Sequence, residues 1–535
     1  MSDLLIHNAR IRTMDPANPM ADWLLCRNGR VVALGLGHPP EMAEMIDAGG
    51  RLVLPGFQDA HIHLLSGGTD LATAAQLYEV ADEAALLEAL SAHARAKPDL
   101  PVILGAGWQP GIFGDHNLTA ALLDRAVPDR PVVIFDSSYH NACLNSRALE
   151  IAGIGADTAD PPNGHILRDA GGRATGMLHE EAIPWATARL PQLTEAHLMQ
   201  GLMTGQAHAN AHGLTGVLDP KITATEAALY GRAAREGALS LRVAGAALVT
   251  EADTPETALA RLTALRAGHP GPEFHVHSAK FFMDGVFENR TAALLADYAD
   301  APGNAPCMFG ADQTAALFTA LDAARFAIHV HAIGDAATRR AIAGLEAARA
   351  ANGPWPAQHQ LAHLQLVDPA DHARLAGLAT ANIQPLWARR DPVVPDIALD
   401  MIGPSRLGDT YAFRKMLDAG ADWCLSSDWP VSTLNPFEII ETAVTRQARR
   451  VEGPKPPFLP DQALTVQECV LGYTTHAARA CWREGFTGML RPGFSADLIV
   501  LDRDIFTCPA DEISATEVLL TLFRGFVVHS SPRLT

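Results

Sequence analysis

The chain lacks the features that mark several large classes of protein. Its 535 residues include 7 cysteines, an odd number with no CxxC pair, which argues against a disulfide framework and against a zinc ribbon. Basic residues number 41 against 60 acidic ones, and an acidic surface repels nucleic acid. No apolar run approaches the ~20 residues that cross a bilayer, and residues 1–10 lack the pattern of a secretory signal. We therefore expect a cytoplasmic protein that binds neither nucleic acid nor membrane.

The length and the order of apolar segments predict more than one domain. A chain of 535 residues usually divides into two or three domains. Short apolar runs bounded by turns near both termini predict strands. They favour a composite β-sandwich domain formed by residues 1–54 and 486–535. The domain between them, residues 55–66 and 201–485, alternates strand-like and helix-like segments.

Eight strand-like segments in the middle of the chain alternate with helical, often alanine-rich, segments, as an α/β fold of the (β/α)8 (TIM) barrel type requires. The expected strands are Gly56–His63, Leu214–Asp219, Leu241–Leu248, Val276–Met283, Ala327–Ala332, Gln360–Leu364, Ala379–Gln384 and Trp423–Ser427. The long gap between the first two strands contains strands and helices of its own. It predicts an α/β insertion after strand 1, residues 67–200, over the barrel mouth.

Two histidines at the end of the first expected strand form a candidate metal site. Side chains alternate along a strand, so His61 and His63 share one face and can both reach one metal ion. Imidazole suits zinc and neighbouring first-row metals. An HxH pair alone is a weak signal, however, because two polar residues on an exposed strand give the same pattern.

The HxH pattern occurs twice more, so position must distinguish the copies. His331 lies at the C-terminal end of its strand, the face on which barrel active sites are built. His329 lies one layer deeper, where a packing role is the better interpretation. The remaining copy, His275 and His277, has the opposite parity to Lys280. If Lys280 points into the barrel, these two histidines point outward.

Three further residues complete the candidate set. A buried lysine is costly unless it is paired or chemically changed. Reaction with CO2 would turn Lys280 into an anionic ligand able to bridge two metal ions, whereas the alternative is a salt bridge to a carboxylate such as Asp284. His363 ends another strand, where a lone histidine can also be structural. Asp428 follows the last strand, where a carboxylate can bind metal and move a proton or simply cap a turn.

Longer motifs run along essentially the whole chain. They include PGFQDAHIH, KFFMDGVFENRTAALL, HVHAIGDAA, HLQLVDPADHAR, IQPLW, YAFRKML, SSDWPV, AVTRQ, LTVQECVLGYTTHAAR and GMLRPGFSADLIVLD. Together they resemble the metal-dependent amidohydrolase superfamily. The similarity is closer to its YtcJ-like branch, which includes N-substituted formamide deformylases.

This resemblance implies a (β/α)8 barrel with a β-sandwich from both termini, an insertion after strand 1 and a divalent metal, zinc, as one or two ions. The implied ligands are His61, His63, Lys280, His331, His363 and Asp428. His61 and His63 would hold one ion, and His331 and His363 would hold a second. Lys280, as N6-carboxylysine, would bridge the two ions, and Asp428 would also shuttle protons. The chain departs from the branch at His329, which is commonly another residue there, and at Ala362, where an acidic residue is usual.

Four further residues resemble residues that bind substrate in the family. Trp108 and His140 lie in the expected insertion, and Arg290 and Arg414 would bind a carbonyl or a carboxylate. The alternative for each is a local structural hydrogen bond.

The motifs of other hydrolases are missing, which narrows the chemistry. The segment GFSAD at residues 493–497 is not GxSxG, so a serine nucleophile is not expected. We expect metal-activated water to attack a non-peptide C–N bond of a small-molecule substrate, either a linear amide or an N-substituted formamide. A cyclic amidase, a deaminase and a non-catalytic regulatory or binding protein are the alternatives. A homodimer is the default assembly.

Overall fold

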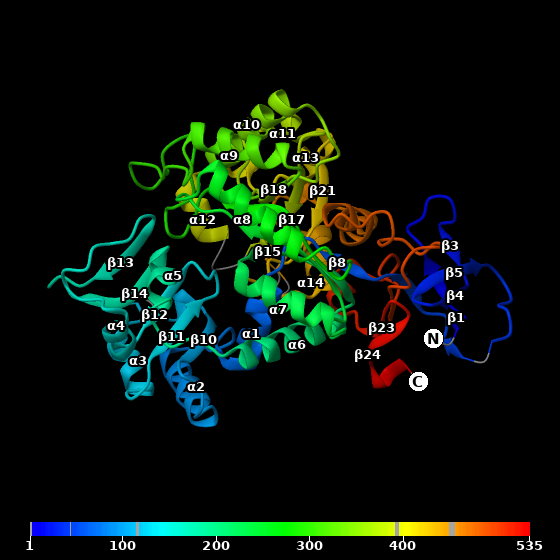
Figure 1. Cartoon of the computed structure of the whole chain (residues 1–535), viewed down its shortest axis with the longest axis horizontal. Coiled ribbons are helices and arrows are strands. Elements are labelled where there is room, and N and C mark those ends of the chain that lie inside the picture. The colour runs from blue at the N-terminus through cyan, green and yellow to red at the C-terminus, as the bar shows by residue number, and fades with distance from the viewer. Residues whose placement is uncertain (1–2, 43, 114–116, 391–394, 449–454, 535) are drawn as a thin grey trace. The chain divides into compact units, whose positions relative to one another are not determined.

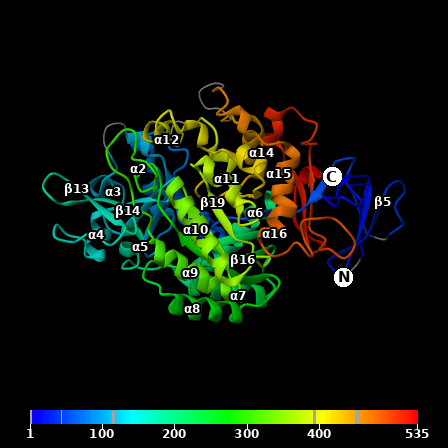
Figure 2. The same cartoon turned by 90° about the horizontal axis from the view of Figure 1, so that it is seen from above.

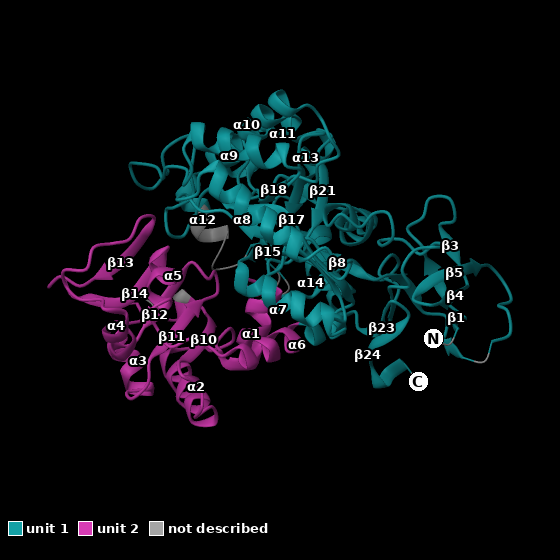
Figure 3. Cartoon of the chain, viewed as in Figure 1, with its two compact units in different colours: residues 1–63, 206–429, 433–535 teal, residues 64–205, 430–432 magenta. Residues whose placement is uncertain are grey.

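The computed structural model describes residues 3–42, 44–113, 117–390, 395–448 and 455–534 (Figure 1). Contacts divide the chain into two compact units (Figure 3). Unit 1 comprises Met1–His63, Gln206–Trp429 and Thr433–Thr535, and unit 2 comprises Leu64–Gly205 and Pro430–Ser432. Within the described part of the chain, every helix is too short or too polar to span a membrane.

Unit 1 contains a parallel sheet of eight strands that forms a nearly closed barrel. Its strands follow one another in sequence order, as in a (β/α)8 barrel. They are β8 (Phe57–Asp59), β15 (Leu214–Ile222), β16 (Arg242–Leu248), β17 (Phe274–Phe282), β18 (Ala327–Ala332), β19 (Gln360–His363), β20 (Thr380–Ile383) and β21 (Asp422–Leu425). The first and last strands meet where Ala60 N–H donates to the carbonyl of Leu425 (3.5 Å). The predicted barrel is confirmed, and every expected strand overlaps an observed one.

Helices lie outside the barrel strands (Figures 1 and 2). They begin where the sequence supplies caps: Thr223 precedes α7 and exchanges hydrogen bonds with Glu226, and Thr254 caps α8, whose first residue is Pro255. The helices of unit 1 after β15 are α7 (Ala224–Arg235), α8 (Pro255–Gly268), α9 (Ala311–Ala323), α10 (Asp335–Asn352), α11 (Pro369–Leu375), α12 (Pro395–Ile402), α13 (Phe413–Asp418), α14 (Pro436–Thr445), α15 (Val466–Leu471) and α16 (Ala477–Ala480).

Gly56, just before the first barrel strand, is required by close packing. A Cβ added there would collide with the side chain of Thr215 on the neighbouring strand β15. Glycine removes that conflict, so β8 can lie against β15 and bring the following histidines to the barrel rim.

The two ends of the chain form a β-sandwich in unit 1. One sheet has the order β5-β4-β1-β6 and the other β24-β23-β22-β7-β2-β3. Their strands are β1 (Leu4–His7), β2 (Arg10–Arg12), β3 (Met20–Ala21), β4 (Trp23–Arg27), β5 (Arg30–Gly35), β6 (Met45–Asp47), β7 (Leu52–Pro55), β22 (Leu498–Leu501), β23 (Val518–Phe523) and β24 (Phe526–Ser530). Leu24 of the first sheet and Val53 and Val500 of the second share one buried cluster. The composite sandwich is thus confirmed.

Unit 2 is an α/β unit around a mixed sheet with the order β13-β14-β12-β11-β10-β9. The strands are β9 (Ala74–Gln76), β10 (Ile103–Trp108), β11 (Val132–Asp136), β12 (Asn141–Leu144), β13 (Gly164–Arg168) and β14 (Ala174–Glu180), and the helices are α1 (Leu64–Thr73), α2 (Glu83–Ala96), α3 (Ala120–Ala126), α4 (Ser146–Ala152) and α5 (Ala182–Thr187). The division between the units falls within α6 (Glu195–Ala211). Val133 and Ile134 are neighbours on β11, and their side chains belong to two different buried clusters. Both faces of the sheet are therefore covered. The expected α/β insertion after strand 1 is confirmed. Its exact boundaries and its place over the barrel mouth stay predictions.

Candidate metal centre

Side chains from the first and last barrel strands meet at the carboxyl ends of these strands. His61 Nε2 and His63 Nε2 each lie 3.4 Å from Asp428 Oδ1. Backbone hydrogen bonds join the two segments, from Asp428 N to His61 O (2.9 Å) and from His63 N to Trp429 O (2.8 Å). Ligand atoms that bind one zinc ion tetrahedrally at about 2.1 Å lie about 3.4 Å from each other. Each histidine nitrogen therefore lies at the distance from Asp428 Oδ1 that two ligands of one metal ion would have.

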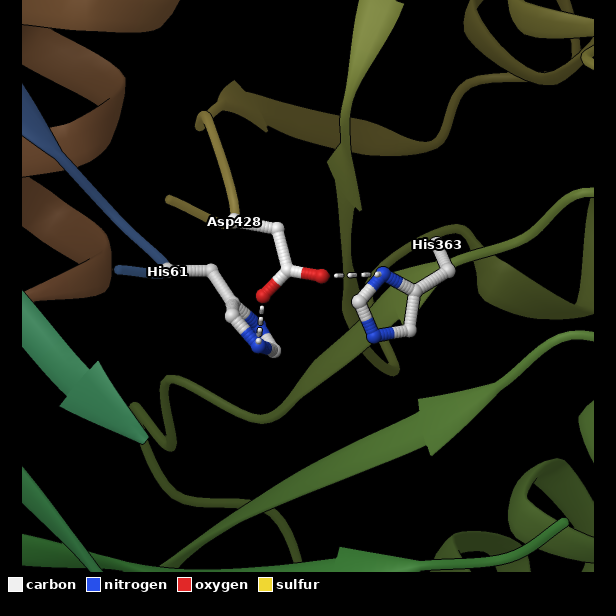
Figure 4. A group of neighbouring side chains, drawn as sticks. All are labelled: His61, His363 and Asp428. Carbon is white, nitrogen blue, oxygen red and sulfur yellow. Dashed lines mark ion pairs between the residues drawn. The ribbon is translucent and has the colours of Figure 1, made fainter. Parts of the chain in front are cut away.

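His363 adds a third imidazole beside the same carboxylate (Figure 4). Its Nδ1 lies 3.9 Å from Asp428 Oδ2. One ligand atom from each of His61, His363 and Asp428 can be chosen so that all lie within 4.8 Å of one another. The His363 ring also packs against His331, with ring centroids 4.4 Å apart, and His331 Nε2 lies 3.2 Å from the carbonyl oxygen of Gly285. The structure thus brings the four predicted histidines and Asp428 into one cluster.

Lys280 is wholly buried on β17. Burial lowers the pKa of its amine to about 7, although the charge of Asp428 opposes this shift. Among the described residues Nζ has no hydrogen-bond partner. Asp284 is not that partner, since its carboxylate accepts three backbone N–H groups, two of them just before α10. Lys280 is therefore a buried amine that loses its charge near neutral pH, and no counterion from the described residues is bound to it.

Ring contacts place His275 and His277 apart from Lys280, as the alternation of side chains along β17 predicts. The rings of His275 and His277 pack against each other, with centroids 4.2 Å apart, and that of His277 against Trp482 (5.6 Å). Lys280 instead interacts electrostatically with Asp428. The second HxH copy is therefore separate from the cluster.

His329 contacts the site directly, contrary to the expectation that it only packs. Its Nε2 lies 2.8 Å from His61 Nδ1, although the two residues are 268 positions apart. Burial lowers the pKa of both rings well below the ordinary histidine value, so both are neutral, the form in which histidine binds metal. No local sequence signal predicts this contact, because it depends on how β8 and β18 pack across the barrel.

Asp59 is a second residue that the sequence reasoning missed. Its carboxylate accepts the backbone N–H of His61 (3.1 Å) and of Ser427 (3.1 Å). It therefore ties together the two segments that carry His61 and Asp428. Burial raises its pKa to about 7. The sequence signal that could have indicated it is its place two residues before His61, which puts both residues on one face of the expected strand Gly56–His63.

Several backbone conformations at the cluster are strained. Asp428 has φ 55°, and His363 and Leu364 have φ 79° and 49°. Residues other than glycine rarely adopt these left-handed values, and such strain concentrates at functional sites. Asp428 and His363 are consequently aimed by the turns that follow their strands.

Comparison with known proteins identifies the family. Residues 44–529 match the model of the amidohydrolase family. The chain belongs to this family. It is 28% identical to YtcJ of Bacillus subtilis over 92% of this chain and 91% of YtcJ. It is also 28% identical to the N-substituted formamide deformylase of Arthrobacter pascens over 98% of each chain. The crystal structure of an uncharacterized metal-dependent hydrolase from Pyrococcus horikoshii has the same fold, with a TM-score of 0.76 and 23% identity over 95% of this chain and 99% of that one.

In this amidohydrolase the two arginines predicted to bind substrate have local partners. Arg290 makes a two-point ion pair with Asp300 (2.8 and 2.6 Å). Arg414 makes another with Glu468 (2.8 and 2.6 Å), and Glu468 also caps α15. Both arginines thus have the local structural bonds that were the alternative interpretation, and a role in substrate binding stays a prediction.

Trp108 and His140, also predicted to bind substrate, lie in unit 2 of the amidohydrolase. Trp108 is buried at the end of β10 and packs near Phe113, with ring centroids 6.4 Å apart. His140 Nδ1 lies 2.6 Å from Glu180 Oε2. Their contacts with substrate stay predictions.

We expect the substitution Arg414→Gln to destabilise the protein in a pH-dependent way. Partial burial raises the pKa of Glu468, but hydrogen bonds from Arg414 and Thr465 outweigh it and lower the pKa from 4.5 to about 2. The pair therefore stabilises fully above pH 4.5 and loses its effect as the pH falls toward 2. Because both side chains are partly exposed, we expect a loss of about 1 kcal/mol at pH 7. Thermal unfolding at pH 7 and pH 3 should show a smaller difference from wild type at pH 3. Equal melting temperatures at pH 7 would contradict this role.

Proposed function

We propose that this amidohydrolase uses a divalent metal, zinc, as one or two ions, to hydrolyse the C–N bond of a linear amide or an N-substituted formamide. The observation that carries the proposal is the buried group of His61, His363 and Asp428, whose ligand atoms lie within 4.8 Å of one another. The similarity to an N-substituted formamide deformylase over 98% of both chains supports the substrate class.

The chain's own residues suit a hydrolytic reaction. When bound, a divalent metal supplies Lewis acidity, which lowers the pKa of water from ~15.7 to near ~7 and polarises a carbonyl group. Asp428 Oδ1 is buried and, within the described residues, accepts no hydrogen bond. Asp428 takes a proton from the attacking water as the water oxygen adds to the carbonyl carbon. It then gives that proton to the nitrogen as the C–N bond breaks, which yields a carboxylic acid, or formate, and an amine.

Lys280 is proposed to react with CO2. Its pKa of about 7 leaves a substantial fraction of the amine neutral at neutral pH, and only the neutral amine is nucleophilic. The Nζ lone pair bonds to the carbon of CO2, one proton leaves, and the product is a carbamate with one negative charge. This group would give Lys280 an anionic oxygen ligand for metal next to the histidine cluster.

Product analysis tests the proposed reaction. The zinc-loaded protein would be incubated with linear amides, N-substituted formamides, cyclic amides and amino-heterocycles, with Asp428→Asn as the inactive control. We expect an amine together with formate or another carboxylic acid from a linear substrate. Ring-opened acid alone, or ammonia alone, would contradict the substrate class, and no product from any substrate would contradict hydrolysis. A cytoplasmic location and a homodimer, both expected from the sequence, stay predictions.

A further inference from the structure

We propose that His329 is a positioning residue that fixes the tautomer and the orientation of His61 for metal binding. The inference rests on the metal site of the proposed function. It starts from the 2.8 Å contact between His329 Nε2 and His61 Nδ1. No other described side chain forms a hydrogen bond with the His61 ring.

The two nitrogens of His61 face different groups. Nε2 lies 3.4 Å from Asp428 Oδ1, on the side that His63 Nε2 also reaches, whereas Nδ1 faces His329. A neutral imidazole that binds a metal through one nitrogen carries its proton on the other. His61 Nδ1–H must then donate to His329 Nε2, so His329 holds its own proton on Nδ1.

The surroundings of His329 suit this role. The ring is fully buried on β18, between register neighbours Lys280 on β17 and Gln360 on β19. Gln360 is itself fixed, because its side chain donates to the carbonyl of Ala480 (2.9 Å) and accepts from Asn382 (2.8 Å). His329 Nδ1 has no partner in the described structure, so the contact with His61 is the one hydrogen bond that orients this ring.

The expected benefit is in metal affinity. A ligand whose ring is already oriented loses less freedom when the metal binds, and removal of such outer partners typically weakens metal binding by about 10–100-fold. His329 differs from the usual partner of a metal-bound histidine, a carboxylate or a carbonyl. It accepts the His61 proton through Nε2, the nitrogen that faces His61.

Three substitutions of His329 distinguish the effect of its hydrogen bond from the effect of its packing. His329→Gln keeps an acceptor at about the place of Nε2, whereas His329→Leu removes it. His329→Asn has a polar side chain too short to reach His61, and it replaces the leucine variant if that one does not fold. The matched control is His275→Leu, a buried histidine of the same barrel that packs against His277 rather than the cluster.

Zinc affinity, measured by competition with a chelator, and the visible absorption of the cobalt-loaded protein provide the readouts. We expect the leucine or asparagine variant to bind zinc about 10–100-fold more weakly and to change the cobalt absorption. The glutamine variant should stay nearer to wild type, and His275→Leu should match wild type. If wild type binds zinc and the leucine and asparagine variants bind it equally well, this inference is overturned. It is also overturned if glutamine is as poor as leucine, or if His275→Leu loses as much affinity. A wild-type protein that binds no zinc would instead contradict the proposed function.

Discussion

The variant Asp428→Asn is expected to lose at least about 100-fold in kcat/KM, since general acid–base catalysis contributes that much or more. Asparagine keeps the size and one oxygen of the side chain but cannot take a proton from water. The backbone at this position has φ 55°, a conformation that asparagine tolerates as well as aspartate. We therefore expect a folded protein whose metal content stays near that of wild type. Steady-state kinetics and metal analysis of the same sample check both parts.

A suitable control is Asp322→Asn. Asp322 is another buried carboxylate of the barrel, it also pairs with a histidine, and its Oδ1 lies 3.2 Å from His359 Nε2. It lies on α9 rather than at the carboxyl ends of the strands, so its variant should retain activity. Full activity of Asp428→Asn would show that another group moves the proton.

The second large effect is expected at Lys280. The substitution Lys280→Met keeps a side chain of similar length but removes the amine that would become a carbamate. We expect metal affinity or activity to fall by at least about 100-fold, because a ligand is lost rather than an outer partner. The metal-free variant should be as stable as wild type or more so, since a buried amine without a hydrogen bond is replaced by an apolar group.

Carbon-13 NMR after incubation with labelled bicarbonate distinguishes the modification from a plain structural role. Wild type should show a carbamate signal that Lys280→Met lacks. The control is Lys221→Met, at an exposed lysine of β15, which should keep the signal. A wild type without the signal, or a fully active Lys280→Met variant, would contradict carboxylation.

The parts of the fold that depend on local pattern could be predicted from the sequence. The strand Ala327–Ala332 has the expected limits, and β17 begins two residues earlier than expected, at Phe274. Strand ends are harder to predict because they depend on pairing with neighbouring strands as well as on the strand's own residues. The alternation of side chains separated Lys280 from His275 correctly because alternation is also a local property.

The parts of the site that depend on contacts across the barrel could not be predicted. The neighbours His61 and His329 come from strands far apart in the chain. Whether a histidine one layer below the rim packs or forms a hydrogen bond depends on the tilt of these strands. Arg414 gives a similar case, because its carboxylate partner Glu468 belongs to a later helix. Charge and residue type indicate that such groups need partners, but not which ones.

The most direct test of the metal site compares the metal content of purified wild type with that of the variant carrying His61→Ala and His63→Ala. Both proteins are first exposed to zinc, and the unbound zinc is then removed. The account predicts one or two ions for each wild-type chain. The variant should lose at least the ion that these two histidines bind. An equal metal content in both proteins, or none in wild type, would contradict it.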